Sequence, residues 1–171
     1  MRRDERAWIR GAAAGSVPDL EQLFRAHWPR AYRAAYLIVH DGAAAEDIAQ
    51  EAFLAAVRSL DRFDRRRPFG PWLHRIVANR SIDWARARAV RAEVALGDGN
   101  APTAEGPELG NSTAIVNELL ELSPEHRAVV VLRYLLDYTP GEIADLLEIP
   151  RGTVNSRLRR GLDQLGANLD G

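Results

Sequence analysis

Cysteine is absent from this chain of 171 residues, and that absence narrows its chemistry. Without cysteine the chain has no disulfide, no thiolate metal site and no nucleophilic thiol. The histidines, His27, His40, His74 and His126, are too far apart in the sequence for a local metal cluster. Few residue types remain that could carry catalysis, and we expect no metal and no cofactor.

Long apolar runs are missing as well. The longest stretches, such as residues 128–132, fall far short of the roughly 20 residues that a membrane span needs. The N-terminus, Met1-Arg2-Arg3-Asp4-Glu5, lacks the apolar core of a signal peptide. With 46% hydrophobic residues, the composition suits one or two small soluble domains. We therefore expect a cytoplasmic protein without membrane insertion.

Lysine is also absent, so all 23 basic residues are arginine. Arginine binds carboxylates and phosphates bidentately, although genomic base composition produces the same bias.

The distribution of charge is more informative than the net charge of -1. Residues 1–91 carry a net charge of +6, residues 92–126 carry -7 and residues 127–171 are neutral. Two basic surfaces, at 58–91 and 150–162, suggest a polyanion bound at two places, with ordinary solvated helix faces as the alternative.

A stretch rich in glycine and proline divides the chain. Residues 97–113 contain four glycines and two prolines and show no sustained periodicity, which is typical of a flexible linker. We predict a first domain over residues 1–92, a linker over 93–115 and a second domain over 116–171.

The first domain is predicted to be helical. Apolar residues recur at helical spacing over 19–40, where Pro29 is expected to kink or divide the helix. Asp41-Gly42 predicts a turn, and the segments 43–60 and 72–87 continue as helices, the latter able to start at Pro71.

The second domain is predicted to hold a helix-turn-helix. Ser123-Pro124 predicts a helix start before the valine-rich run 128–136, for which a buried strand is the alternative. Thr139 to Glu142 is a capping box, and a short break at 148–150 leads to a last helix. On that helix Val154, Leu158, Leu162 and Leu165 are expected to share the core face. Short helices with a tight turn and arginines on the second resemble a DNA reader, while a helical hairpin with solvated arginines would give the same pattern.

Two exposed faces follow from the helical spacing. On the last helix the outward residues Arg151, Asn155, Ser156, Arg159 and Arg160 could enter a major groove, with Arg157 near the phosphates. On the helix 43–60, the face opposite the apolar stripe carries Asp47, Gln50, Glu51, Leu54 and Arg58. That face suits a partner helix bearing arginine, or it is an ordinary solvated face.

Six short sequence motifs, taken in their order along the chain, resemble those of the extracytoplasmic-function (ECF) sigma factors of bacterial RNA polymerase. The resemblance covers nearly the whole chain. Residues 45–54 (AEDIAQEAFL) and 69–79 (FGPWLHRIVAN) are similar to sigma region two. Residues 122–127 (LSPEHR), 131–134 (VLRY), 142–144 (EIA) and 152–158 (GTVNSRL) are similar to region four.

The resemblance implies an all-α, two-domain, non-catalytic subunit whose partners are core RNA polymerase, promoter DNA and an anti-sigma factor. It implies that Asp47, Gln50, Glu51 and Leu54 bind core polymerase. It implies that the loop 63–71 and the following helix open and hold the minus-ten element, through Arg65, Arg66, Arg67, Asn79, Arg80, Asp83 and Arg86. Phe69, Trp72 and Arg75 offer further stacking planes and positive charge, although Trp72 also suits the core. The minus-thirty-five duplex would be read by Arg151, Thr153, Asn155, Ser156, Arg157, Arg159 and Arg160.

Three departures from the family pattern limit this carry-over. Asn155 stands where lysine or arginine is common, Glu148 stands where a glycine often closes the first helix, and the loop contains both Pro68 and Pro71. We therefore transfer no promoter sequence. The 17 residues 97–113 reach about 58 Å when extended, so two domains holding elements about 80 Å apart would stretch this segment.

Two other functions compete with this interpretation. A conventional helix-turn-helix regulator that binds duplex DNA as a dimer would explain residues 116–169 but not the first 91. A helical enzyme or an adaptor would need a polar constellation in a pocket, which the sequence does not indicate.

Overall fold

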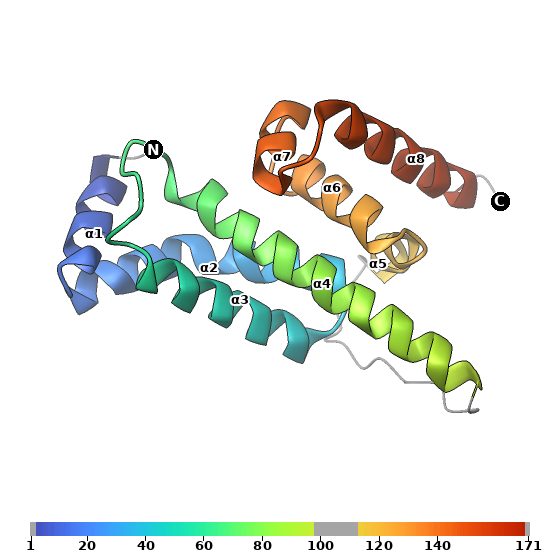
Figure 1. Cartoon of the computed structure of the whole chain (residues 1–171), viewed down its shortest axis with the longest axis horizontal. Helices are drawn as coiled ribbons and strands as arrows, with labels where there is room; N and C mark the ends of the chain where they lie inside the picture. The colour runs from blue at the N-terminus through green and yellow to red at the C-terminus, as the bar shows by residue number, and fades with distance from the viewer. Residues whose placement is uncertain (1–2, 98–112, 170–171) are drawn as a thin grey trace.

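The computed structural model describes residues 3–97 and 113–169, and within them every regular element is a helix. The first domain consists of α1 (Arg3–Ala13), α2 (Val17–Val39), α3 (Gly42–Arg58) and α4 (Phe69–Gly97). The second consists of α5 (Thr113–Leu120), α6 (Pro124–Tyr134), α7 (Pro140–Leu147) and α8 (Arg151–Leu169). The predicted all-α fold with two helical domains is confirmed (Figure 1).

Side-chain caps define several helix starts. The Asp41 carboxylate accepts a hydrogen bond from the Ala44 amide at 2.9 Å, so the predicted turn at Asp41-Gly42 is the N-cap of α3. Ser123 caps α6, which excludes the strand alternative for the valine run. At α7 the Thr139 hydroxyl accepts from the Glu142 amide at 3.3 Å, and the Thr139 amide donates to Glu142 Oε2 at 2.7 Å. The predicted capping box is therefore present.

The long helix α2 passes through Pro29 without a break. Proline has no amide hydrogen, so the carbonyl of Arg25 loses its usual donor. Both residues lie on the exposed side of α2, where water can replace the lost hydrogen bond. The helix ends at His40, which adopts the left-handed conformation at φ 52°.

Several segments differ from the sequence-based prediction. Helix α1 was not predicted; it packs on α2 through the fully buried Ile9 and half-buried Trp8. Helix α4 continues to Gly97, ten residues past its predicted end, and α5 begins at Thr113. Both helices thus enter the predicted linker 93–115, and residues 98–112 of that linker lie outside the described part of the chain.

The core of α8 contains one correction to the predicted stripe. Val154 and Leu158 are buried as expected, but Leu162 is 42% exposed. Gly161 takes the buried place instead, and a side chain added there would meet Val130 at 3.1 Å. The core face follows positions i, i+4 and i+7 on a helix of 3.6 residues per turn, so Leu162 lies beyond its edge.

The two domains pack against each other. Helices α2 and α4 contact α6, and α4 also contacts α7. In Figure 1 the first domain forms a bundle crossed by the long α4, whose C-terminal end projects beyond it, and the second domain lies along one side of α4.

Candidate nucleic-acid and polymerase interfaces

The exposed face of α3 holds the residues predicted to bind polymerase. Ile48, Ala52, Phe53 and Ala56 are buried, as the apolar stripe predicts. Asp47, Gln50, Glu51 and Leu54 all point to solvent, and Leu54 is 54% exposed. The structure therefore brings the four predicted residues together on one accessible surface.

An apolar groove adjoins this face and was not predicted. It has a volume of about 540 Å³ and lies between α2 and α3, beside Leu54. Val17 and Phe24 of α2 are exposed along it, and the Phe24 ring packs edge-on against Phe53 with centroids 5.1 Å apart. Phe24 is one of the apolar residues that recur at helical spacing over 19–40, and that spacing alone does not show that its ring is exposed. Apolar side chains framed by Glu21 and Gln50 suit an amphipathic helix.

Arginines project from the loop that joins α3 to α4. Arg65, Arg66 and Arg67 are exposed, and the loop is ordered by Asp64, whose carboxylate accepts a hydrogen bond from the Arg66 amide at 3.0 Å. An Asx turn of this kind fixes the backbone, and the same Asp64 carboxylate lies 4.0 Å from Arg67 Nε. The loop thus presents three positive charges side by side.

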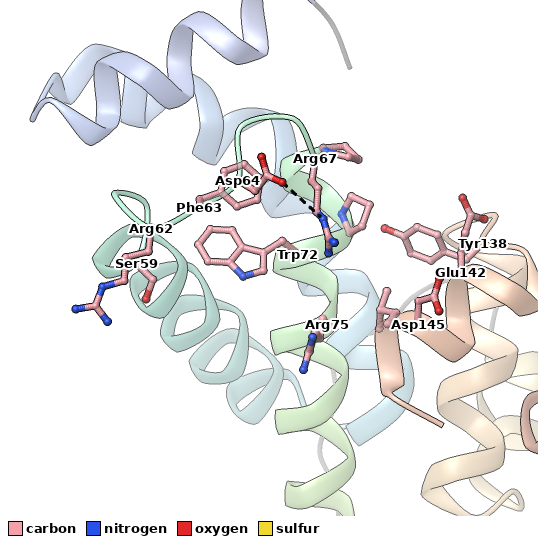
Figure 2. Close-up of a pocket in the computed structure, with 13 residues that line it drawn as sticks. Ser59, Arg62, Phe63, Asp64, Arg67, Trp72, Arg75, Tyr138, Glu142 and Asp145 are labelled. Atoms are coloured by element: carbon pink, nitrogen blue, oxygen red, sulfur yellow. Dashed lines mark ion pairs between the residues drawn. The ribbon is translucent and has the colours of Figure 1, made fainter. Parts of the chain in front are cut away.

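Aromatic side chains pack at both ends of the loop between α3 and α4. Phe63 and Trp72 stack with centroids 4.6 Å apart, and both contact Phe69 edge-on. Phe69 is fully buried, so the expectation that it stacks on a DNA base is wrong: it anchors the start of α4 in the core. Trp72 is half-buried and lines a cleft of about 630 Å³ between the loop and α7 (Figure 2).

The exposed stripe of α4 continues the positive surface. Asn79, Arg80, Asp83 and Arg86 all face solvent at helical spacing. Arg80 pairs with Glu51 at 2.5 Å, and Arg86 lies 3.9 Å from Asp83. Asn79 has an exposed amide that can donate to and accept from a base edge.

The turn between α7 and α8 sets the angle of the last helix. Glu148 ends α7 at φ 55°, a conformation that glycine adopts without strain. The departure from the family pattern at this position therefore leaves the turn geometry intact. Pro150 then precedes α8, and its carbonyl accepts hydrogen bonds from the Thr153 and Val154 amides at 2.9 and 3.2 Å.

Not all the predicted reader residues on α8 are equally available. The exposed ones are Arg151, Asn155, Arg159 and Arg160. Ser156 is half-buried, and its hydroxyl donates to the Thr153 carbonyl at 3.0 Å. Arg157 is also half-buried, and its charge is among those that lower the pKa of Glu125. Asn155 and Arg159 therefore have the freedom that base reading requires.

Other kinds of site are not found in the described residues. Within 3–97 and 113–169, no three metal-ligating side chains lie together. No helix in these two ranges has the length and apolarity needed to cross a membrane.

Comparison with known proteins agrees with this geometry. Residues 23–91 match the family model "Sigma-70 region 2", and residues 112–165 match "Sigma-70, region 4". The chain is 36% identical to the ECF RNA polymerase sigma factor SigW of Bacillus subtilis over 153 residues, covering 81% of this chain and 82% of SigW. It is 32% identical to the ECF sigma factor SigL of Mycobacterium tuberculosis, covering 95% of this chain and 96% of SigL.

Solved structures show the same fold. CnrH, solved in complex with the cytosolic domain of CnrY, is 29% identical and superposes with a TM-score of 0.73 over 98% of this chain and 97% of CnrH. The sigma factor RpoE of Bartonella quintana, solved with the anti-sigma factor NepR, gives a TM-score of 0.74 at 22% identity, over 90% of this chain and 98% of RpoE. With both sigma regions matched in order, the chain belongs to the ECF sigma factors of bacterial RNA polymerase.

Proposed function

We propose that three surfaces of this chain divide the work of a sigma factor. A sigma factor is a non-catalytic specificity subunit that binds core RNA polymerase and directs it to promoters. In this chain, the α3 face of Asp47, Gln50, Glu51 and Leu54 docks on core polymerase. The adjoining apolar groove extends that contact onto α2.

The loop and α4 form the second surface, which holds the melted minus-ten element. Single-stranded DNA requires positive charge for its backbone and polar or flat groups for its unpaired bases. Arg65, Arg66 and Arg67 supply exposed charge, and the Asn79 amide lies farther along on α4. Arg80, Asp83 and Arg86 complete this surface.

The third surface is α8, which reads the minus-thirty-five element as duplex. The exposed residues Arg151, Asn155, Arg159 and Arg160 face the groove, with Thr153, Ser156 and Arg157 near its rim. Arginine and asparagine are the side chains that pair most readily with base edges in the major groove. We keep 1–92, 93–115 and 116–171 as the proposed functional division, with the end of α4 and the start of α5 extending into the middle segment.

An anti-sigma factor controls this activity. Support comes from the solved relatives, because RpoE was solved with the anti-sigma factor NepR and CnrH with the cytosolic domain of CnrY. We place the action of the chain in the cytoplasm, where polymerase transcribes the chromosome.

The observation that carries the proposal is the presence of both sigma regions with their exposed surfaces in one chain. Its test is to measure binding of the full chain to core polymerase and, separately, to promoter duplex. Tight binding to core and weak binding to free duplex are expected. Specific duplex binding by a dimer, with no affinity for core, would instead establish the helix-turn-helix regulator.

A further inference from the structure

Two carboxylates of the second domain form ion pairs with arginines of α4. Arg75 pairs with Glu148 at 2.5 Å, and Arg86 pairs with Glu125. Glu148 ends α7, and Glu125 lies in the first turn of α6, so each pair joins the two domains. Burial alone would raise the pKa of Glu125, but hydrogen bonds from its own backbone amide and from Arg86 outweigh burial and lower it. Glu125 is therefore held ionised against α4.

A buried arginine ties the same domains together at another point. Arg127 of α6 donates hydrogen bonds to the carbonyls of Leu119, Leu120 and Leu122 at 2.7 to 3.0 Å. The same guanidinium donates to the carbonyl of Ile38, in the last turn of α2. Carbonyls at helix C-termini lack partners within the helix and carry partial negative charge, so one cation satisfies two helix ends.

A third contact also joins the two domains. His74 Nδ1 of α4 and the Tyr138 hydroxyl, at the loop before α7, are 2.7 Å apart and share a hydrogen bond. The cleft shown in Figure 2 opens beside this contact, with Trp72 and Arg75 on one wall and Tyr138, Glu142 and Asp145 on the other. The acidic wall thus faces the basic one.

We infer that Glu125 and Glu148 act as an internal phosphate mimic, which masks the DNA-binding arginines of α4 while the two domains are closed on each other. This inference rests on the proposed role of α4 at the minus-ten element. A carboxylate binds guanidinium in the way that a phosphate does, so Glu148 and Glu125 compete with DNA phosphates for Arg75 and Arg86. Arg65, Arg66 and Arg67 are not covered by the second domain, so the mask acts on the helix and not on the loop.

The mask links promoter binding to a change of domain arrangement. Release of the second domain from α4 frees Arg75 and Arg86 for DNA, and the same movement lets α8 reach a distant element. The Arg75–Glu148 pair is exposed and stabilises the closed state weakly, so a partner that binds the open state better can open it.

A charge reversal tests the mask in the full chain. In the variant E125R/E148R, arginines face Arg75 and Arg86, and attraction becomes repulsion. Because the chain has no cysteine, dyes placed at A43C and G166C, one exposed position in each domain, report the domain separation by energy transfer. We expect lower energy transfer, and affinity for a single-stranded oligonucleotide of about 12 nucleotides that is at least roughly ten-fold higher than in the parent.

Two companion variants separate masking from simple addition of charge. The control E121R/D163R changes the charge of the second domain equally, at exposed positions that take no part in either ion pair with α4, and it should leave energy transfer unchanged. Adding R75E/R86E to E125R/E148R restores both ion pairs with reversed sign. That fourfold variant should recover energy transfer without recovering oligonucleotide binding.

Two results would overturn the inference, and they differ in meaning. Unchanged energy transfer in E125R/E148R would show that these carboxylates do not hold the domains closed, leaving the proposed function untouched. Lower energy transfer, with no more affinity than in E121R/D163R, would show that Arg75 and Arg86 do not bind DNA. That second result would also remove Arg86 from the proposed minus-ten surface.

Discussion

The guanidinium of Arg80 on α4 lies 2.5 Å from the carboxylate of Glu51 on α3. This ion pair joins a residue proposed to bind polymerase to one proposed to bind minus-ten DNA, so the two surfaces are contiguous. The Glu51 side chain is 62% exposed and the Arg80 side chain 42%, and such an exposed pair contributes at most about 1 kcal/mol to stability. Its importance is that a change at Glu51 also alters Arg80, which makes Glu51 a poor single probe of polymerase binding.

Polymerase docking is better tested at Asp47 and Leu54. Asp47→Arg with Leu54→Ala should weaken binding to core by about ten-fold or more, because both side chains are exposed on the proposed contact face. Exposed substitutions change stability by about 0.5 kcal/mol or less, so helicity should be unaffected. Titration of labelled core polymerase measures the affinity. Glu93→Arg, an exposed reversal near the far end of α4, is the control, and equal affinities for the two proteins would refute the docking assignment.

DNA melting should depend on the loop arginines and Asn79. Replacing Arg65, Arg66, Arg67 and Asn79 by alanine should spare the closed complex and reduce strand opening, followed by permanganate reactivity of unpaired thymines. An artificial bubble across the minus-ten element supplies the opened strand and should rescue transcription. If the bubble gives no rescue, these residues have a role other than melting.

The last helix should show two kinds of DNA contact. Asn155→Ala or Arg159→Ala should relax preference at particular minus-thirty-five positions, since a bidentate base contact discriminates by about 1 to 3 kcal/mol. Arg157→Ala should weaken all promoters alike and lower the salt slope by about one unit. Asparagine pairs best with adenine, so we expect A opposite Asn155. Holoenzyme binding to a randomised library gives the readout, and an unchanged base profile for Asn155→Lys would show that this side chain does not read sequence.

Stability should fall with acid in a window set by His74. Burial, with smaller contributions from His27 and Arg30, lowers the pKa of His74 to about 4. In the unfolded chain the His74 imidazole takes up a proton near pH 6.5, whereas in the folded chain it stays neutral until about pH 4. The free energy of unfolding is therefore highest above pH 6.5 and decreases as the pH falls towards 4. The full loss is about 3 kcal/mol. His40, whose pKa burial also lowers, acts in the same direction.

Denaturant unfolding between pH 4 and 7 measures this slope. His74→Asn should flatten it, whereas Tyr138→Phe should reduce stability at pH 7 but retain the slope, because burial and not the hydrogen bond is the main cause of the shift. A slope that is the same in wild type and His74→Asn would contradict this explanation.

Local signals in the sequence predicted the helices that carry caps. Ser123, Asp41 and the Thr139 capping box act within a few residues, so their effect can be read without knowing the fold. The same signals were weak for α1, where the apolar face is short and consists of Trp8, Ile9, Ala12 and Ala13. They were also weak for the end of α4, where no proline or cap marks the last turn. Leu162 was misplaced because the stripe drifts by one residue over two turns, and because glycine at 161 gave no apolar signal.

Contacts between distant segments were beyond sequence patterns. Phe69 was expected to offer a stacking plane, but its burial depends on Phe63 and Phe53, which converge on it from other segments. The pairs that close the domains join residues far apart in the sequence; Arg127 and the Ile38 carbonyl, for example, are 89 positions apart. Charge segregation along the chain indicated a basic surface on α4 but not that acidic residues of the second domain cover part of it.

Mapping the transcripts of reconstituted holoenzyme tests the central claim most directly. Core polymerase with and without this chain would transcribe genomic DNA from its own organism, and the 5′ ends would be sequenced. The predicted result is a set of start sites that require the chain and share two upstream motifs, near minus ten and minus thirty-five. Start sites that are the same without the chain, or that share no motif, would contradict its assignment as a promoter-specificity subunit.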